Sequence, residues 1–143
     1  MAFDHVVTVR FQHVDRAGIA FFSRAFEYCH ETFEELLAAA GLASVFEVEG
    51  WGMPLVHADA DFRAPMRLGD RLSVAVVVAD LGERSITFRF EIKGAEDGRV
   101  RATVCHVHAF VELGGFRPRQ VPDSVRHGLA RVGLIEPAAD LGG

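Results

Sequence analysis

A single carboxylate, Asp15, lies in a short turn between a β-branched segment and a strongly helical one, in the stretch "FQHVDRAGIAFFSRAFEYCHE". In most proteins an acid in this place forms the turn or caps the helix, because Asp accepts hydrogen bonds from nearby backbone amides. The same geometry also has the parts for acyl transfer. If the helix begins near residues 18–23, its first amides have no intrahelical acceptor and can bind a negative oxygen.

Beside such amides, the carboxylate of Asp15 can attack an ester or thioester carbonyl, or act as the base for a water that attacks it. The amides would stabilise the oxyanion that forms. Gly18 suits both interpretations, because a residue without Cβ permits a left-handed turn and close approach of a substrate to the backbone. The residues therefore predict an acid at a helix start and leave open whether its role is structural or catalytic.

The elements that hold this turn follow from the hydrophobic pattern. Residues 5–11 are β-branched and roughly alternating, which predicts a strand that ends just before the turn. From Phe22 onward, apolar residues recur at helical spacing in one stripe, which predicts a long helix ended by Gly41. The stripe holds Phe26, Cys29, Phe33, Leu36, Leu37 and Ala40, and a face expected to be acidic and solvated holds Glu27, Glu31, Glu34 and Glu35.

Four strands are expected after the helix. Beyond the glycine-containing connector "EGWGMP", residues 55–63 alternate, with one apolar face and one polar face. Three longer strands are expected at residues 70–80, 84–94 and 99–112, joined by short turns and hence antiparallel. A short helix is expected within residues 122–132. One long helix on one face of such a sheet is an α+β layer, here in a single domain of residues 1–143.

Composition argues against several kinds of partner. The chain has 143 residues and a formal net charge of −5, with no run of Lys or Arg, so no nucleic-acid partner is expected. The start of the chain does not resemble a signal peptide, and no apolar run approaches about 18 residues, which indicates a cytoplasmic protein without a membrane partner. Cys29 and Cys105 fall in apolar segments and are expected to be buried thiols, although a reactive Cys29 stays open.

The string "VRFQHVDRAGIAFF", followed by a long helix, resembles the opening of the 4-hydroxybenzoyl-CoA thioesterase family of hotdog-fold proteins. The family pattern is an aromatic residue, three residues, Asp, two residues, Gly and an apolar run, and Asp15 and Gly18 match its marked positions. The segments "CHETFE" and "PLVHADADFRAPMRLGDRLSV" are similar to the 1,4-dihydroxy-2-naphthoyl-CoA thioesterase branch in particular. The resemblance covers about residues 6–112. Arg16 and the pair Phe21 and Phe22 depart from the usual residues, which leaves the preferred acyl group open.

This resemblance implies a hotdog fold, in which a five-stranded antiparallel sheet wraps one long helix and two subunits share active sites at their interface. It implies hydrolysis of an acyl-CoA without a metal or redox cofactor, by a homodimer at least and, we expect, a homotetramer. Asp15 matches the catalytic acid. The amide near Phe22 matches the group that polarises the thioester carbonyl.

Substrate contacts are also implied by the resemblance. In the family, the strand that matches "PLVHADADF" lines the acyl pocket of the neighbouring chain, which indicates His57 and Asp59 as candidates. The turn before the fourth strand contacts CoA phosphates, which indicates Arg84 and Ser85. These four residues and Gly18 are therefore the candidate substrate-binding residues.

Other assignments are weaker. Glu31 is the alternative acid, because a related thioesterase group takes its acid from the long helix, but a position opposite the apolar stripe fits a solvated side chain better. His106, His108 and Glu112 have the spacing of a metal motif but lack the later histidine strand that it needs, so ordinary strand histidines are expected. A non-catalytic acyl-CoA-binding module and a dehydratase acting on a hydroxyacyl thioester stay open as alternative functions.

Overall fold

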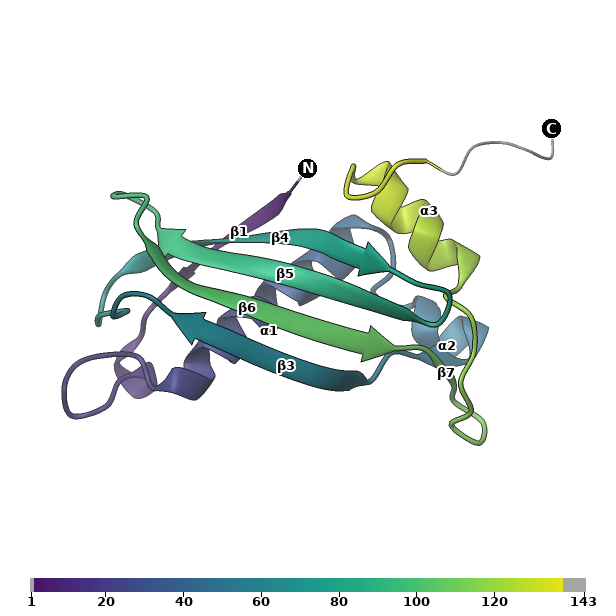
Figure 1. Cartoon of the computed structure of the whole chain (residues 1–143), viewed down its shortest axis with the longest axis horizontal. Helices are drawn as coiled ribbons and strands as arrows, with labels where there is room; N and C mark the ends of the chain where they lie inside the picture. The colour runs from purple at the N-terminus through teal and green to yellow at the C-terminus, as the bar shows by residue number, and fades with distance from the viewer. Residues whose placement is uncertain (1, 138–143) are drawn as a thin grey trace.

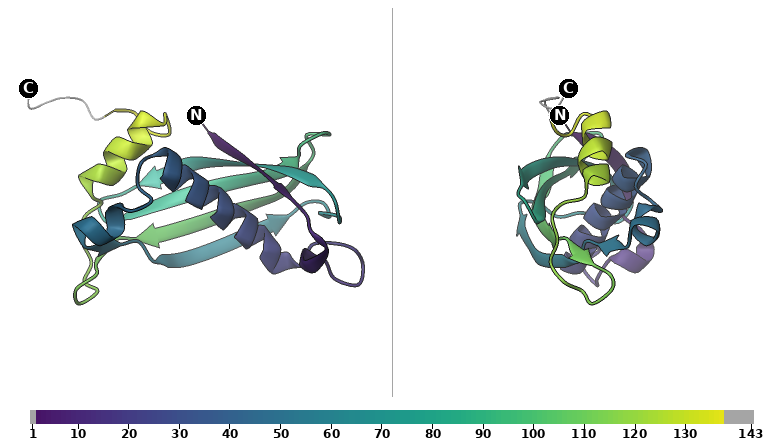
Figure 2. Two further views of the ribbon diagram at one scale, coloured as in Figure 1. Left: turned by 180° about the vertical axis from the view of Figure 1, so that it is seen from behind. Right: turned by 90° about the vertical axis from the view of Figure 1, so that its right-hand side faces the viewer.

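The computed structural model describes residues 2–137 of the chain (Figure 1). Its main sheet has five antiparallel strands in the order β1-β4-β5-β6-β3. These strands are β1 (Phe3–Thr8), β3 (Leu55–Phe62), β4 (Arg71–Leu81), β5 (Ser85–Gly94) and β6 (Val100–Ala109). Figure 2 shows the sheet curving around one long helix, α1 (Phe22–Ala39). The predicted α+β arrangement is confirmed.

The core lies between α1 and the concave face of the sheet. Strand β5 alternates as the sequence predicts, and its inward side chains Ile86, Phe88, Phe90 and Ile92 are all buried. On the helix, Phe33 packs edge-on against Phe88 with ring centroids 5.5 Å apart. The predicted apolar stripe is therefore confirmed in the middle of α1. The predicted stripe is not buried at the start of the helix, where Phe22 is 59% exposed.

The last predicted strand, residues 99–112, is wrong at its end. Strand β6 stops at Ala109, and after Phe110 the chain forms β7 (Val111–Glu112), which pairs with β2 (Trp51–Gly52) in a separate two-stranded sheet. Burial of aromatic rings explains the break, because Trp51 is fully buried between Phe46 and Phe110. Periodicity along one strand cannot show that its last residues turn to cover a distant tryptophan.

Two short elements were not predicted. The helix α2 (Val45–Glu49) has only five residues, which is too short for helical periodicity to detect. The first strand was expected over residues 5–11, but β1 spans residues 3–8 and a 3-10 turn, η1 (Phe11–His13), follows it. The predicted final helix is confirmed as α3 (Asp123–Arg131). Within residues 2–137, no helix is both long and apolar enough to span a membrane.

The face of α1 expected to be acidic and solvated is exposed as predicted, at Glu27, Glu31, Glu34 and Glu35. Glu31 also reaches toward β1, where its Oε2 lies 2.7 Å from Nε2 of His5. Glu31 therefore fastens the edge strand β1 to the helix, while its own side chain stays half exposed.

Candidate active site

Asp15 lies in an exposed loop between η1 and α1, and its own backbone and side chain shape that loop. The Asp15 N–H donates to the Ile19 carbonyl at 3.0 Å, and the Gly18 N–H donates to the Asp15 carbonyl at the same distance. The Ala17 N–H donates to the carboxylate Oδ1 at 2.8 Å. Within residues 2–137, Oδ2 has no hydrogen-bond partner, so one oxygen orders the turn and the other is exposed without a protein donor.

Gly18 has the backbone conformation that the sequence predicts for it. Its φ of +75° lies in the left-handed region, which favours a residue without Cβ. The Gly18 carbonyl accepts the Leu68 N–H at 3.1 Å, and the Ala20 N–H donates to the Met66 carbonyl at 2.7 Å. The limb of the loop that enters α1 is therefore fixed to the segment between β3 and β4.

The helix start beside this loop is uncapped. The N-cap residue of α1 is Phe21, whose side chain makes no capping hydrogen bond, so the N-capping interpretation of Asp15 is wrong. The Phe21 N–H donates to the His13 carbonyl and the Arg24 N–H to the Phe21 carbonyl. The amides of Phe22 and Ser23 are the first two of the helix and have no intrahelical acceptor. One loop thus joins a carboxylate to a helix start that can bind an oxyanion.

His57 and Asp59 lie on the opposite face of the sheet from α1. Their neighbours on β6 are Val107 and Cys105, whereas the buried His106 lies opposite Ala58. The Nε2 of His57 lies 2.8 Å from Oδ2 of Asp59, and both side chains are exposed. Within one chain, this pair does not join the Asp15 loop.

Arg84 and Ser85 lie at the other end of the molecule from Asp15. The segment at Leu68 that binds the Asp15 loop precedes β4, whereas Arg84 follows it. Because β4 has 11 residues, its two ends are about 35 Å apart. Figure 1 shows the β4–β5 turn and the loop before α1 at opposite ends of the sheet. Within a single chain, Asp15, Gly18 and Phe22 therefore lie close together in the sequence at one end of the sheet, and the remaining candidate residues lie elsewhere.

Two histidines lie in the core, which the sequence pattern did not predict. His106 and His108 are only 3% and 4% exposed and face α1 from β6. His108 donates from Nδ1 to the Met53 carbonyl at 2.8 Å and stacks on Phe33. Among the described residues, Nε2 of either ring has no partner. The alternation Val104, His106, His108, Phe110 was the available signal, because each of these residues points inward.

Burial keeps both rings uncharged. It lowers the pKa of His106 to about 4, and the neighbouring His108 and His30 act in the same direction. Burial also lowers the pKa of His108, although the hydrogen bond to Met53 opposes this. The described part of the chain holds no group of three or more His, Cys, Asp or Glu that fits a metal, and Glu112 lies on β7 rather than on the strand of the histidines.

The buried histidines predict a loss of stability in acid. An imidazole whose pKa is lowered by folding takes up its proton only on unfolding, so stability is complete above about pH 6.5 and falls as the pH drops toward 4. For His106 the loss is expected to reach between about 1 and 3 kcal/mol. Urea unfolding at several pH values should show this loss in the wild type and a smaller one in His106→Phe. Equal losses in both proteins would contradict the assignment.

The cysteines behave as small buried side chains. Cys29 is fully buried in α1, and burial raises the pKa of its thiol, so a reactive thiolate at this position is not supported. Cys105 is partly buried on the outer face of β6, where burial and then Asp59 raise its pKa. Arg89, opposite Cys105 on β5, acts to lower the pKa of this thiol, but burial and Asp59 outweigh it, so neither thiol is favoured as a thiolate.

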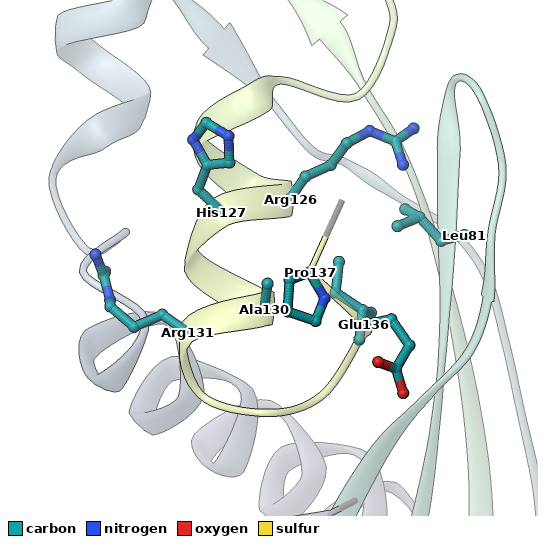
Figure 3. Close-up of a pocket in the computed structure, with 8 residues that line it drawn as sticks. Leu81, Arg126, His127, Ala130, Arg131, Glu136 and Pro137 are labelled. Carbon is teal, nitrogen blue, oxygen red and sulfur yellow. The ribbon is translucent and has the colours of Figure 1, made fainter. Parts of the chain in front are cut away.

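A cavity of about 550 Å³ lies away from these groups, at the end of the molecule that holds α3. Figure 3 shows α3, with Arg126, as one wall and the β4–β5 hairpin, with Leu81, as the other. Its lining is mostly apolar and includes no acid beside unpaired helix amides. Asp15 of the same chain does not line this cavity.

The family model of the thioesterase-like superfamily matches residues 9–129, which include the Asp15 loop and α1. A 1,4-dihydroxy-2-naphthoyl-CoA hydrolase from Nostoc punctiforme is 32% identical over 127 residues, covering 87% of this chain and 84% of that protein. The enzyme of the same name from Acaryochloris marina is 35% identical over 105 residues, covering 70% and 77%.

A solved structure is similar over nearly the whole chain. The 1,4-dihydroxy-2-naphthoyl-CoA thioesterase from Synechocystis superposes with a TM-score of 0.84 at 26% identity, covering 91% of this chain and 96% of that one. The resemblance seen in the sequence is thus confirmed by the family model, by curated relatives and by the fold. The chain therefore belongs to the thioesterase-like superfamily and is a thioesterase with the hotdog fold.

Proposed function

We propose that this thioesterase hydrolyses an aromatic acyl-CoA, with 1,4-dihydroxy-2-naphthoyl-CoA as the first candidate. The names of its relatives support the substrate, since two of them at 32% and 35% identity are hydrolases of this thioester. The hydrogen bonding of Asp15 supports the proposed chemistry. Asp15 orders its own turn through Oδ1, while Oδ2 has no protein partner, in the loop that leads directly into the uncapped start of α1.

In the proposed reaction, the thioester carbonyl oxygen binds at the amides of Phe22 and Ser23. Asp15 then acts in one of two ways. As a nucleophile it forms a C–O bond to the acyl carbon, the C–S bond breaks, the CoA thiolate leaves, and water hydrolyses the resulting anhydride. As a base it takes a proton from a water, the hydroxide adds to the acyl carbon, and the departing thiolate receives that proton. Both routes release a free acid and CoA.

The helix amides contribute through the charge that develops on the carbonyl oxygen. Removing one preorganised donor of this kind typically raises the barrier by about 3–4 kcal/mol. The positive end of α1, a helix of 18 residues, favours the same negative charge. Because the donor is a backbone amide, the exposed ring of Phe22 is free to contact the acyl group.

We further propose that the enzyme is a homodimer that pairs through β3. This strand is one of the two edges of the sheet, the other being β1, and several of its large apolar side chains are exposed, among them Val56 (60%) and Phe62 (49%). A long exposed apolar edge is a template for another strand. Antiparallel pairing of two copies would bring the partner's Arg84 and Ser85 toward the end that holds Asp15. Assembly of two dimers into a tetramer, and a cytoplasmic location, stay predictions.

A panel of CoA thioesters with detection of the released thiol tests the proposed substrate class. Aromatic thioesters, including 1,4-dihydroxy-2-naphthoyl-CoA, should give kcat/KM values at least about tenfold above those of aliphatic ones, because a pocket discriminates through differential contacts in the transition state. A preference for aliphatic thioesters would contradict the substrate class. Tight binding of all thioesters without thiol release would contradict hydrolysis itself.

A further inference from the structure

The limb of the loop that carries Asp15 begins at His13. The His13 carbonyl accepts the Phe21 N–H at 2.9 Å, and Val14 pairs with Ala20, so His13 lies at the base of the loop. Its imidazole Nδ1 lies 3.0 Å from the hydroxyl of Tyr28. The same Nδ1 accepts the Arg10 N–H at 3.1 Å. One ring nitrogen thus contacts the start of η1, through Arg10, and the helix α1, through Tyr28, at the base of the loop.

Tyr28 is suited to hold that nitrogen. It lies on α1 and is only 3% exposed, and its ring meets the ring of His13 edge-on with centroids 5.4 Å apart. Burial raises the pKa of Tyr28 to about 12, so the hydroxyl keeps its proton and donates it to Nδ1. Because Nδ1 accepts both the hydroxyl and the amide of Arg10, the ring carries its proton on Nε2.

The two limbs of the loop pair with each other through backbone hydrogen bonds, including those from the Asp15 N–H to the Ile19 carbonyl and from the Phe21 N–H to the His13 carbonyl. Backbone hydrogen bonds to Met66 and Leu68 also fix the limb that enters α1, as described above. The limb that carries Asp15 is held in addition by side chains of α1. Besides Tyr28, these include Arg24, whose guanidinium donates to the Gln12 carbonyl at 3.1 Å. The position of Asp15 relative to the helix therefore depends in part on side-chain contacts one and two turns into α1.

We propose that His13 and Tyr28 are positioning residues, whose hydrogen bond sets where Asp15 lies relative to the first amides of α1. This inference rests on the proposed catalytic role of Asp15. A misplacement of about 1 Å at a reacting group can lower the rate about 100-fold, so a contact that only orients a loop can control turnover. Neither residue needs to touch the substrate.

Kinetics of matched variants test the positioning role. Tyr28→Phe removes only the hydroxyl, whereas His13→Ala removes its acceptor together with the Arg10 hydrogen bond and the ring contact to Tyr28. Each should lower kcat at least about tenfold and leave KM within about twofold, because the loss concerns the reacting geometry rather than binding. The double variant should be no slower than His13→Ala alone, because that single variant already removes the shared interaction. His13→Asn should restore kcat to within about threefold, because its side-chain oxygen can accept near the place of Nδ1.

Proteolysis gives a readout that does not depend on catalysis. The loop contains Arg16, and trypsin cleavage after Arg16, followed by mass spectrometry, measures how often the loop opens. Cleavage should rise several-fold in Tyr28→Phe and His13→Ala and stay near the wild-type rate in His13→Asn. Glu31→Gln is the control, because Glu31 lies on the same helix as Tyr28 but contacts His5 on β1 and not the Asp15 loop.

The outcomes separate this inference from the proposed function. If Tyr28→Phe and His13→Ala keep wild-type kcat and wild-type cleavage at Arg16, the positioning role is wrong. Additive losses in the double variant, or lowered kcat without faster cleavage, would also overturn it. If cleavage rises as expected but Asp15→Asn remains active, the contact holds the loop and the catalytic assignment of Asp15 fails instead.

Discussion

Asp15→Asn is expected to lower kcat for thioester hydrolysis by about 10²- to 10⁴-fold, the range typical for loss of a positioned general base or nucleophile. The amide is neutral, so it can neither attack the acyl carbon effectively nor accept a proton from water. It can still accept the Ala17 N–H, as Oδ1 of Asp15 does at 2.8 Å. The loop should therefore keep its shape, and KM should change little. Thiol release under saturating substrate measures the effect.

Glu31→Gln is the matched control for this loss. Glu31 is the alternative catalytic acid, but its carboxylate contacts His5 on β1 rather than an uncapped helix start. The variant should retain kcat within about twofold and lose at most a few tenths of a kcal/mol of stability, because the pair is half exposed. A large loss in Glu31→Gln together with an active Asp15→Asn would move the catalytic acid to the helix.

The Asp15 loop could be predicted from the sequence because its signals are local. A β-branched run, a turn with Asp and Gly, and a stripe of apolar residues at helical spacing all fall within residues 5–41. The predicted range for the helix start, residues 18–23, includes the observed start at Phe22. What the pattern left open was the role of Asp15 in the turn, because a capping and a turn-forming acid occupy similar places in a sequence.

The parts that sequence reasoning missed depend on contacts between distant residues. Trp51 takes residues 111 and 112 out of β6 because its ring is buried against Phe110. His106 and His108 look like surface residues by type, yet their places on the inner face of β6 put them under Phe26 and Phe33. The polarity of the two histidines predicts a place on the surface, whereas the alternation of residues along β6 predicts a place in the core. The packing of α1 on the inner face of β6 buries them.

For Arg84 and Ser85, a substrate-binding role depends on how two chains assemble. Arg84 and Ser85 lie about 35 Å from the Asp15 end of the same sheet. Their role can be tested only if a second copy brings the two ends together. Neither the sequence nor one chain contains that information directly. The exposed edge of β3 is the feature of the single chain on which the proposed dimer rests.

Ala60→Pro is expected to leave the chain folded but monomeric, with at least about 100-fold less activity. The Arg63 N–H donates to the Arg101 carbonyl on β6. In an antiparallel strand the backbone N–H and C=O groups of alternate residues point to the same side, so those of residues 61, 59 and 57 point toward β6. The backbone groups of residues 58, 60 and 62 point toward the open edge. Proline at position 60 therefore removes an N–H from the free edge and no hydrogen bond to β6. Analytical ultracentrifugation gives the assembly state, and thiol release gives the activity.

Ala60→Ser is the matched control, because it keeps a small side chain and the edge N–H and should remain dimeric and active. Ala60→Pro should lose the dimer and the activity together. If the active site is built from both chains, loss of the dimer must remove the activity even though Asp15, Gly18 and Phe22 are unchanged in each chain. A monomeric Ala60→Pro with wild-type kcat/KM would show that one chain holds the whole site. A dimeric Ala60→Pro would show that the copies meet elsewhere than along β3.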